Sequence, residues 1–270
     1  MEFDMKLDIL AKNIKYLRNL NRISQNQLAK EANISLPTIK NLESKKNMPS
    51  VEIIQKIAKV FNVRIYDLFN KPKTLNFVRF RSTKHMRIRE NILAEVAIWL
   101  NNYNYLEKCL NEKKGFKLFA IREKCLNVSP AEAAELCRKS LGIKPTDPIN
   151  DICDLLEEAG IKVHLISKAS DDFFGLSIME NDGGPAIVVN IYNKITVERR
   201  IYSAAHELGH LMLHPEAYDV NKIENNEKEE KEADIFASHF LMSDEGFSNE
   251  WNKAIGKPFV DRILKIKSYF

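Results

Sequence analysis

The feature that most constrains this chain of 270 residues is a His-Glu-x-x-His pattern inside an apolar stretch, His206-Glu207-Leu208-Gly209-His210. Four residues make about one turn of an α-helix, so both imidazoles lie on one helix face and can bind the same metal ion. Glu207 then lies beside the metal, where a carboxylate can deprotonate a water molecule. The pattern therefore predicts a helix that carries zinc-dependent hydrolytic chemistry.

The surrounding residues favour two helices that meet at this pattern. Residues 193–212 contain no proline and place apolar side chains on most sides of a helix. Residues 226–242 predict a second helix, in which Glu230 and Asp234 share a face. Its packing side consists of Ala233, Phe236, Ala237 and Phe240. A ligand at Glu230 would complete a site of two histidines and one glutamate, and Asp234 would hold the outer nitrogen of a ligand histidine.

These two segments resemble the ImmA/IrrE group of gluzincin metallopeptidases. The resemblance rests on residues 206–214 followed by Glu230-x-Glu232-Ala233-Asp234, and it covers about residues 145–245. It implies that His206, His210 and Glu230 bind Zn²⁺ and that Glu207 is the general base. It points to Glu230 rather than Glu232 as the third ligand. Asp234 stands where this family usually has Asn.

Three other interpretations of this region remain open. His214 follows His210 at the same spacing, but a helix turns away from a metal centred one turn earlier, which favours a helix-end or surface histidine. The two predicted helices can also be an ordinary buried pair that contains histidines by chance. A third possibility is a zinc-binding fold without catalytic activity.

A second pattern lies near the N-terminus, where short helices follow one another. Ser24 and Gln27 form a capping box, and Ser35 with Pro37 predicts the start of the next helix. The apolar residues expected to fill the centre are Leu28, Ala29, Ile34, Ile39 and Leu42. Residues 8–70 resemble the helix-turn-helix domain of the Cro/CI-like (XRE) family.

In that family the second helix of the motif enters the major groove of DNA. The residues that this places against double-stranded DNA are Gln25 near a phosphate and, on the second helix, Ser35, Leu36, Pro37, Thr38, Lys40 and Asn41. Leu36 and Pro37 stand where related proteins often have polar side chains. Direct base readout is therefore weak or rests on Thr38, Lys40 and Asn41. The alternative is a helical interaction module that does not bind DNA.

Charge is distributed unevenly along the chain. Residues 1–73 hold 14 Lys and Arg against 7 Asp and Glu, and residues 74–125 hold 11 against 5. Residues 126–270 hold 16 against 25. Basic charge in the front half favours a phosphate partner, because release of counterions makes that contribution large. The acidic half is not expected to touch DNA.

The length suits two small domains. We predict a helix-turn-helix domain over residues 1–73, a basic helical linker over 74–125, and a metallopeptidase domain over 126–270. In the linker, apolar residues repeat at heptad-like spacing from Ile92 to Leu110. This seam predicts either a homodimer or packing against a helix at residues 129–141.

Three strands are expected in the C-terminal half, at residues 161–166, 173–179 and 186–189, the last two joined by a hairpin-like turn. The predicted fold is an all-α helix-turn-helix domain, a helical linker, and an α+β zincin-like C-terminal domain with a small, mostly antiparallel sheet. An exposed strand of such a sheet is the natural place for an extended substrate peptide beside the zinc.

The remaining features concern location and redox state. No apolar run approaches 18 residues and the first residues lack an apolar targeting core, so we expect a cytoplasmic protein without a membrane partner. The four cysteines are widely spaced. We expect them to be reduced thiols rather than disulfides or a second metal site.

Together with the two resemblances, these patterns predict a DNA-binding transcriptional regulator with a zinc-dependent endopeptidase domain. The resemblance implies that it cleaves a specific repressor protein in a stress-response or mobile-element circuit. The main alternative is a transcription factor whose zincin-like domain senses a ligand or redox state without proteolysis. A third hypothesis is an antitoxin-like module whose long helix recruits a partner.

Overall fold

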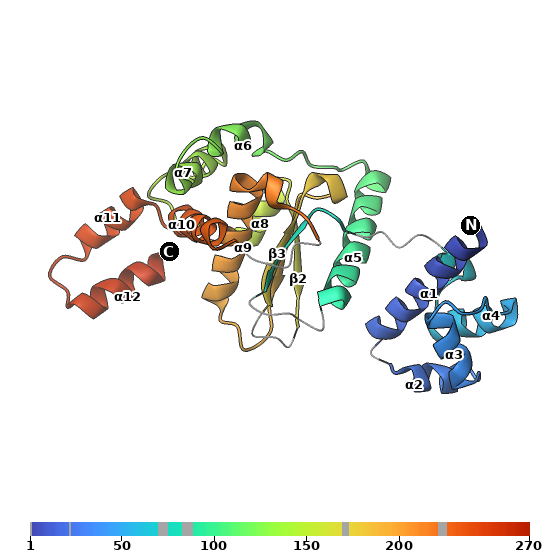
Figure 1. The fold of residues 1–270 in the computed structure, drawn as a ribbon. Coiled ribbons are helices and arrows are strands. Elements are labelled where there is room, and N and C mark those ends of the chain that lie inside the picture. The colour runs from blue at the N-terminus through green and yellow to red at the C-terminus, as the bar shows by residue number, and fades with distance from the viewer. Residues whose placement is uncertain (1, 22, 70–74, 83–88, 169–172, 221–225) are drawn as a thin grey trace. The chain divides into compact units, whose positions relative to one another are not determined.

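The computed structural model describes residues 2–21, 23–69, 75–82, 89–168, 173–220 and 226–270 (Figure 1). The chain divides into two compact units, one formed by Met1–Thr74 with Arg87–Trp99 and the other by Leu75–Met86 with Leu100–Phe270. The boundary predicted at residue 73 lies outside the described residues. Within the described ranges, no helix is long and apolar enough to cross a membrane.

The first unit is a set of short helices. They are α1 (Glu2–Leu20), α2 (Gln25–Glu31), α3 (Leu36–Glu43), α4 (Val51–Val60) and the 3-10 helix η1 (Ile65–Phe69). Ser24, Ser35 and Ser50 each precede a helix and accept a hydrogen bond from a backbone N–H in its first turn, which is the usual N-cap arrangement. The centre of the unit is apolar and fully buried, and it includes Leu10, Ile14, Leu28, Ile39, Leu42 and Ile57.

Helix α5 (Arg89–Leu110) is the long helix predicted in the linker. Its first part belongs to the first unit, where the Tyr16 hydroxyl donates to the Ala94 carbonyl at 3.2 Å. Ile92 and Val96 at the start of the predicted seam are buried, whereas Leu106 and Leu110 at its end are 57% and 65% exposed. The seam is therefore covered only in its first half, and the homodimer stays a prediction.

The second unit contains a four-stranded sheet among its described residues. The strands are β1 (Val78–Ser82), β2 (Lys162–Ile166), β3 (Phe173–Ile178) and β4 (Ala186–Asn190), in the order β1-β3-β4-β2. β3 is antiparallel to both β1 and β4, and β2 is parallel to β4. The sheet is thus mixed and mostly antiparallel, as the sequence predicts.

Strand β1 lies in the range predicted as a helical linker. Its residues alternate between buried Val78 and Phe80 on one side and Arg79 on the other, which is the period of a strand. The pattern is short, and its pairing partner β3 lies about a hundred residues further along the chain. This part of the linker is therefore not helical.

The other helices described in the second unit are α6 (Phe119–Cys125), α7 (Pro130–Ser140), α8 (Ile152–Glu158), α9 (Val197–Leu213), α10 (Glu227–Leu241), α11 (Asp244–Lys253) and α12 (Phe259–Tyr269). Of these, α8 packs on β2. α9 packs on β3 and β4, and α10 packs along α9 (Figure 1). α7 packs mainly against α6, α9 and α10. Packing against α5, one of the two alternatives for the apolar seam, is not among its main contacts.

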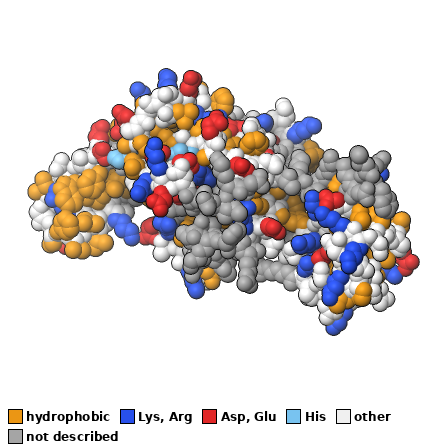
Figure 2. All heavy atoms as spheres, in the orientation of Figure 1, with side chains coloured by type: hydrophobic (Ala, Val, Ile, Leu, Met, Phe, Trp, Pro, Cys, Tyr) orange, Lys and Arg blue, Asp and Glu red, His pale blue; other side chains and the backbone are white. Residues whose placement is uncertain are grey.

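Two further features complete the unit. Apolar side chains gather over α11 and α12 (Figure 2), and they include the exposed Ile255, Phe259 and Val260. The guanidinium of Arg262 stacks on the Trp251 ring at 3.6 Å and joins the two helices. All four cysteines are free thiols, and two of them, Cys125 and Cys137, are buried.

Candidate metal centre

Helix α9 places the His-Glu-x-x-His pattern in the interior of the second unit. Thr196 caps the start of the helix, where its hydroxyl accepts a hydrogen bond from the Arg199 N–H, and residues 203–212 are all buried. Gly209 lies between the two histidines. A Cβ atom there would be 3.2 Å from the Ala233 Cα, so glycine allows α10 to approach α9 closely. This approach brings Glu230 of α10 opposite the histidines.

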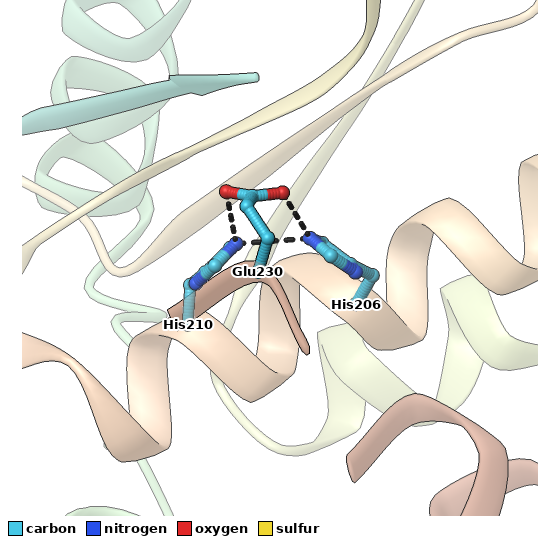
Figure 3. Close-up of side chains that lie close together, drawn as sticks. All are labelled: His206, His210 and Glu230. Carbon is cyan, nitrogen blue, oxygen red and sulfur yellow. Dashed lines mark hydrogen bonds and ion pairs between the residues drawn. The ribbon is translucent and has the colours of Figure 1, made fainter. Parts of the chain in front are cut away.

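His206, His210 and Glu230 converge on one point (Figure 3). The two Nε2 atoms are 2.9 Å apart, and the Glu230 carboxylate oxygens lie 3.3 Å from Nε2 of His206 and 3.4 Å from Nε2 of His210. Nitrogen and oxygen ligands bound tetrahedrally to one zinc ion lie about 3.3 Å from each other. The spacing of the three donor groups therefore suits a single zinc ion.

The hydrogen bond at Nδ1 of His206, the outer ring nitrogen, determines the tautomer of this histidine. Nδ1 lies 2.7 Å from Oδ1 of Asp234, and the Tyr202 hydroxyl donates to the same oxygen at 3.1 Å. A carboxylate only accepts hydrogen bonds, so Nδ1 of His206 carries the proton. Nε2 then directs its lone pair toward His210 and Glu230. Asp234 thus lies within hydrogen-bond distance of this histidine, and its role in holding a metal ligand stays a prediction.

The outer nitrogen of His210 is held through a second histidine. Its Nδ1 lies 3.0 Å from Nδ1 of His214, and Nε2 of His214 lies 2.9 Å from Oε2 of Glu232. Because Glu232 accepts, His214 carries its proton on Nε2 and accepts at Nδ1, so His210 donates from Nδ1. Burial lowers the pKa of His210 to about 3 and keeps it neutral. Its Nε2 also directs a lone pair inward.

Two imidazole lone pairs and a carboxylate therefore face one another inside the protein. Such acceptors repel each other unless a cation lies among them, because none of them can donate a hydrogen bond to the next. Neutral imidazole and carboxylate are ligands that zinc prefers. The donor set fits a zinc ion by both geometry and chemistry. Glu232 and His214, the other candidates for the third ligand, pair with each other outside this group.

Glu207 lies beside the donor group and is fully buried. The Ser177 hydroxyl of β3 donates to its Oε2 at 2.7 Å, and the Tyr218 hydroxyl donates to Ser177 at 2.8 Å. A Cβ atom on Gly175 would lie 3.2 Å from Oε1 of Glu207, so this glycine lets β3 run directly over the carboxylate. The Gly-x-Ser spacing on one strand face could have indicated this contact, whereas no sequence signal marked Tyr218.

Arg79 of β1 also reaches the donor group, and the sequence did not single it out. Its guanidinium donates to Oε1 of Glu230 at 3.0 Å and forms an ion pair with Glu229. The side chain of Arg79 is only 10% exposed. Burial alone would raise the pKa of Glu230, but its polar contacts, among them the Arg79 guanidinium, lower it well below its usual range. The carboxylate is therefore ionised and available as a ligand.

The residues predicted to contact DNA gather on and near α3. Ser35, Pro37 and Lys40 are exposed, and Thr38 and Asn41 are partly exposed. Leu36 differs, because its side chain packs against the apolar centre of the unit. Gln25 donates from Nε2 to Oε2 of Glu43 at 2.7 Å, and Glu43 also accepts from Arg18. Gln25 therefore ties α2 to α3, and its phosphate contact stays a prediction.

Comparison with known proteins finds two family matches. A helix-turn-helix model matches residues 14–68, and an IrrE N-terminal-like domain model matches residues 156–270. An uncharacterised HTH-type transcriptional regulator of Methanocaldococcus jannaschii is 43% identical over 56 residues, which make up 21% of this chain and 85% of that protein. Both resemblances predicted from the sequence are confirmed. The chain belongs to the HTH-type transcriptional regulators, and it joins their DNA-binding domain to an IrrE-like domain with a metallopeptidase-like fold.

Proposed function

We propose that this regulator carries an active zinc-dependent endopeptidase, and that it cleaves a specific repressor protein. The observation that supports the proposal most is the convergence of His206, His210 and Glu230 beside the buried Glu207. A purely structural helix pair has no reason to bury these acceptors against one another, because their mutual repulsion destabilises the fold.

Each residue of the site has a separate role in the proposed hydrolysis. When bound, zinc supplies a Lewis acid that lowers the pKa of water and polarises a carbonyl. Glu207 is placed to accept a proton from the attacking water and to return it to the leaving amine. Ser177 orients the Glu207 carboxylate through its hydrogen bond to Oε2. Asp234 and His214 keep the two ligand histidines in the tautomer whose Nε2 carries no proton.

We further propose that the exposed face of α3 reads DNA. Thr38, Lys40 and Asn41 are accessible there and have side chains that can hydrogen-bond to base edges or phosphates. The excess of basic residues in the first 73 positions supports a phosphate partner. In this proposal Leu36 contributes to packing of the unit rather than to the reading of DNA bases.

One observation favours a second function, a transcription factor that senses a ligand or redox state without proteolysis. Arg79 already pairs with Glu230, and this pairing engages one of the oxygens that a metal would use. A site held in this way could respond to a signal without ever cleaving a peptide bond.

The two functions are separated by measuring zinc content and peptide cleavage on the same preparations. Glu207→Gln keeps the shape of the side chain but removes the proton acceptor, so we expect about one zinc per chain and no hydrolysis of peptide libraries or of candidate repressors. Glu216→Gln, an exposed change of the same kind, is the control and should retain both. Cleavage by Glu207→Gln at the wild-type rate would contradict the peptidase mechanism.

A further inference from the structure

The strand that runs over Glu207 is covered on its outer edge by a segment from outside the IrrE-like domain. The family match over residues 156–270 contains β2, β3 and β4, and within it β3 is an edge strand. β1 comes from the stretch between the two matched regions and pairs antiparallel with β3. The fourth strand is thus an addition to the matched domain, laid along its exposed edge.

The outer edge of β3 belongs to the strand that approaches Glu207, the proposed general base. Gly175 and Ser177 of β3 approach Glu207, and the inner edge of β3 is already paired with β4. A peptide that brings a bond close to Glu207 therefore has to lie along the outer edge of β3. Extended peptides bind such an edge through main-chain hydrogen bonds, with alternate side chains providing specificity.

β1 has the features expected of such a peptide. Arg79 lies opposite Ser177 in the strand register, directly across from the residue that holds Glu207. Its guanidinium extends to Glu230 and Glu229. On the other side of β1, the Phe80 ring stacks on Phe173 with centroids 4.9 Å apart. The strand directs the basic side chain of Arg79 toward the site and the apolar side chain of Phe80 away from it.

We propose that β1 occupies the place of the substrate, so that the site accepts an extended peptide with an apolar-basic-apolar pattern and opens only when β1 leaves the edge of β3. The basic preference comes from Glu229 and Glu230, which form charge-assisted hydrogen bonds with a guanidinium. The substrate class rests on the proposed peptidase function, whereas the displacement of β1 can be tested without cleavage.

The first test loosens β1 and measures binding of a peptide that copies it. A fluorescein-labelled peptide with the sequence of residues 75–82 is titrated by anisotropy into the zinc-loaded full chain. Arg79→Glu and the milder Arg79→Gln remove the anchor of β1, so both should bind the peptide at least tenfold more tightly than wild type. Lys124→Glu, an exposed charge reversal on α6, should bind like wild type. A peptide with Glu at the position of Arg79 should bind the Arg79→Gln chain at least tenfold more weakly than the unchanged peptide does.

The second test locks β1 in place. Met179 donates to the Phe77 carbonyl, so the neighbouring pair Val78 and Ile178 is a non-hydrogen-bonded pair, whose spacing suits a disulfide. In the Arg79→Gln chain, Val78→Cys with Ile178→Cys should lose peptide binding when oxidised and regain it on reduction. Val78→Cys alone should bind in both states.

The outcomes separate this inference from the proposed function. Peptide binding that is equal in the oxidised and reduced forms, or no gain in the Arg79 variants, overturns the role of β1. Redox-dependent binding without hydrolysis supports the role of β1 and contradicts the peptidase. Circular dichroism establishes folding, and if Arg79→Glu fails to fold, Arg79→Gln carries the test.

Discussion

The two units place their candidate functional residues in opposite environments. In the first unit, Ser35 and Lys40 lie on the surface of α3, over a core built from helices close in the sequence. In the second unit, His206, Glu207 and His210 are fully buried, and they have partners on β3 and α10. A surface that reads a ligand tolerates the loss of one side chain. A buried polar site depends on every partner, because an unsatisfied buried group costs about 1–3 kcal/mol.

The two units should also differ in how strongly salt affects their binding of ligands. Exposed basic side chains that neutralise phosphates lose affinity steeply as salt rises. Buried ionic groups such as Arg79 and Glu230 are screened much less. We therefore expect DNA binding and zinc binding by the same chain to respond very differently to ionic strength.

The largest effect should come from removing a donor of the metal centre. His206→Ala deletes one ligand and removes the hydrogen bond between Nδ1 of His206 and Asp234. We expect zinc affinity to fall by more than about 100-fold, which is the upper range for loss of a supporting hydrogen bond. Competition with a chelator measures it. His239→Ala, outside the donor group, should bind zinc normally, and retention of zinc by His206→Ala would place the metal elsewhere.

The next effect tests whether the core of the first unit is independent. Leu28→Ala opens a cavity at a fully buried position and should lower the free energy of unfolding of that unit by about 2–5 kcal/mol. Denaturant titration of the full chain would show an earlier first transition. Lys30→Ala, at an exposed position two residues further along α2, serves as the control. A parallel loss of zinc would contradict the contrast between the two units.

A smaller effect is expected from the support of the ligand histidines. Asp234→Ala removes the carboxylate that fixes the tautomer of His206, and we expect zinc affinity to fall by about 10–100-fold. Asp261→Ala on α12 provides an exposed control. Unchanged zinc affinity would mean that packing, rather than Asp234, orients the imidazole.

The smallest effect is expected on the exposed surface. Lys40→Ala removes one charge near the proposed DNA backbone, so binding should weaken on all sequences and the salt slope should fall by about 1. Gel-shift titrations at several salt concentrations measure it. Lys139→Ala on α7 is the matched control. If Lys40→Ala weakens binding to one sequence only, the residue reads bases instead.

Local patterns predicted much of the fold. The strands expected at residues 161–166, 173–179 and 186–189 are each observed within one residue of those limits. The serine caps at Ser24 and Ser35 begin their helices as predicted. These features depend on side-chain periodicity and on hydrogen bonds over a few residues, so the chain carries the information locally.

The candidate metal centre shows which contacts local sequence patterns do not predict. By itself the sequence determined that His206, Glu207 and His210 share a helix and that Glu230 and Asp234 share another, because helical periodicity sets those faces. Only the tertiary structure decided that Ser177 holds Glu207 and that Arg79 reaches Glu230, 151 positions away. Contacts of that range depend on strand register and on how closely whole helices pack, and no local pattern of side chains specifies either one.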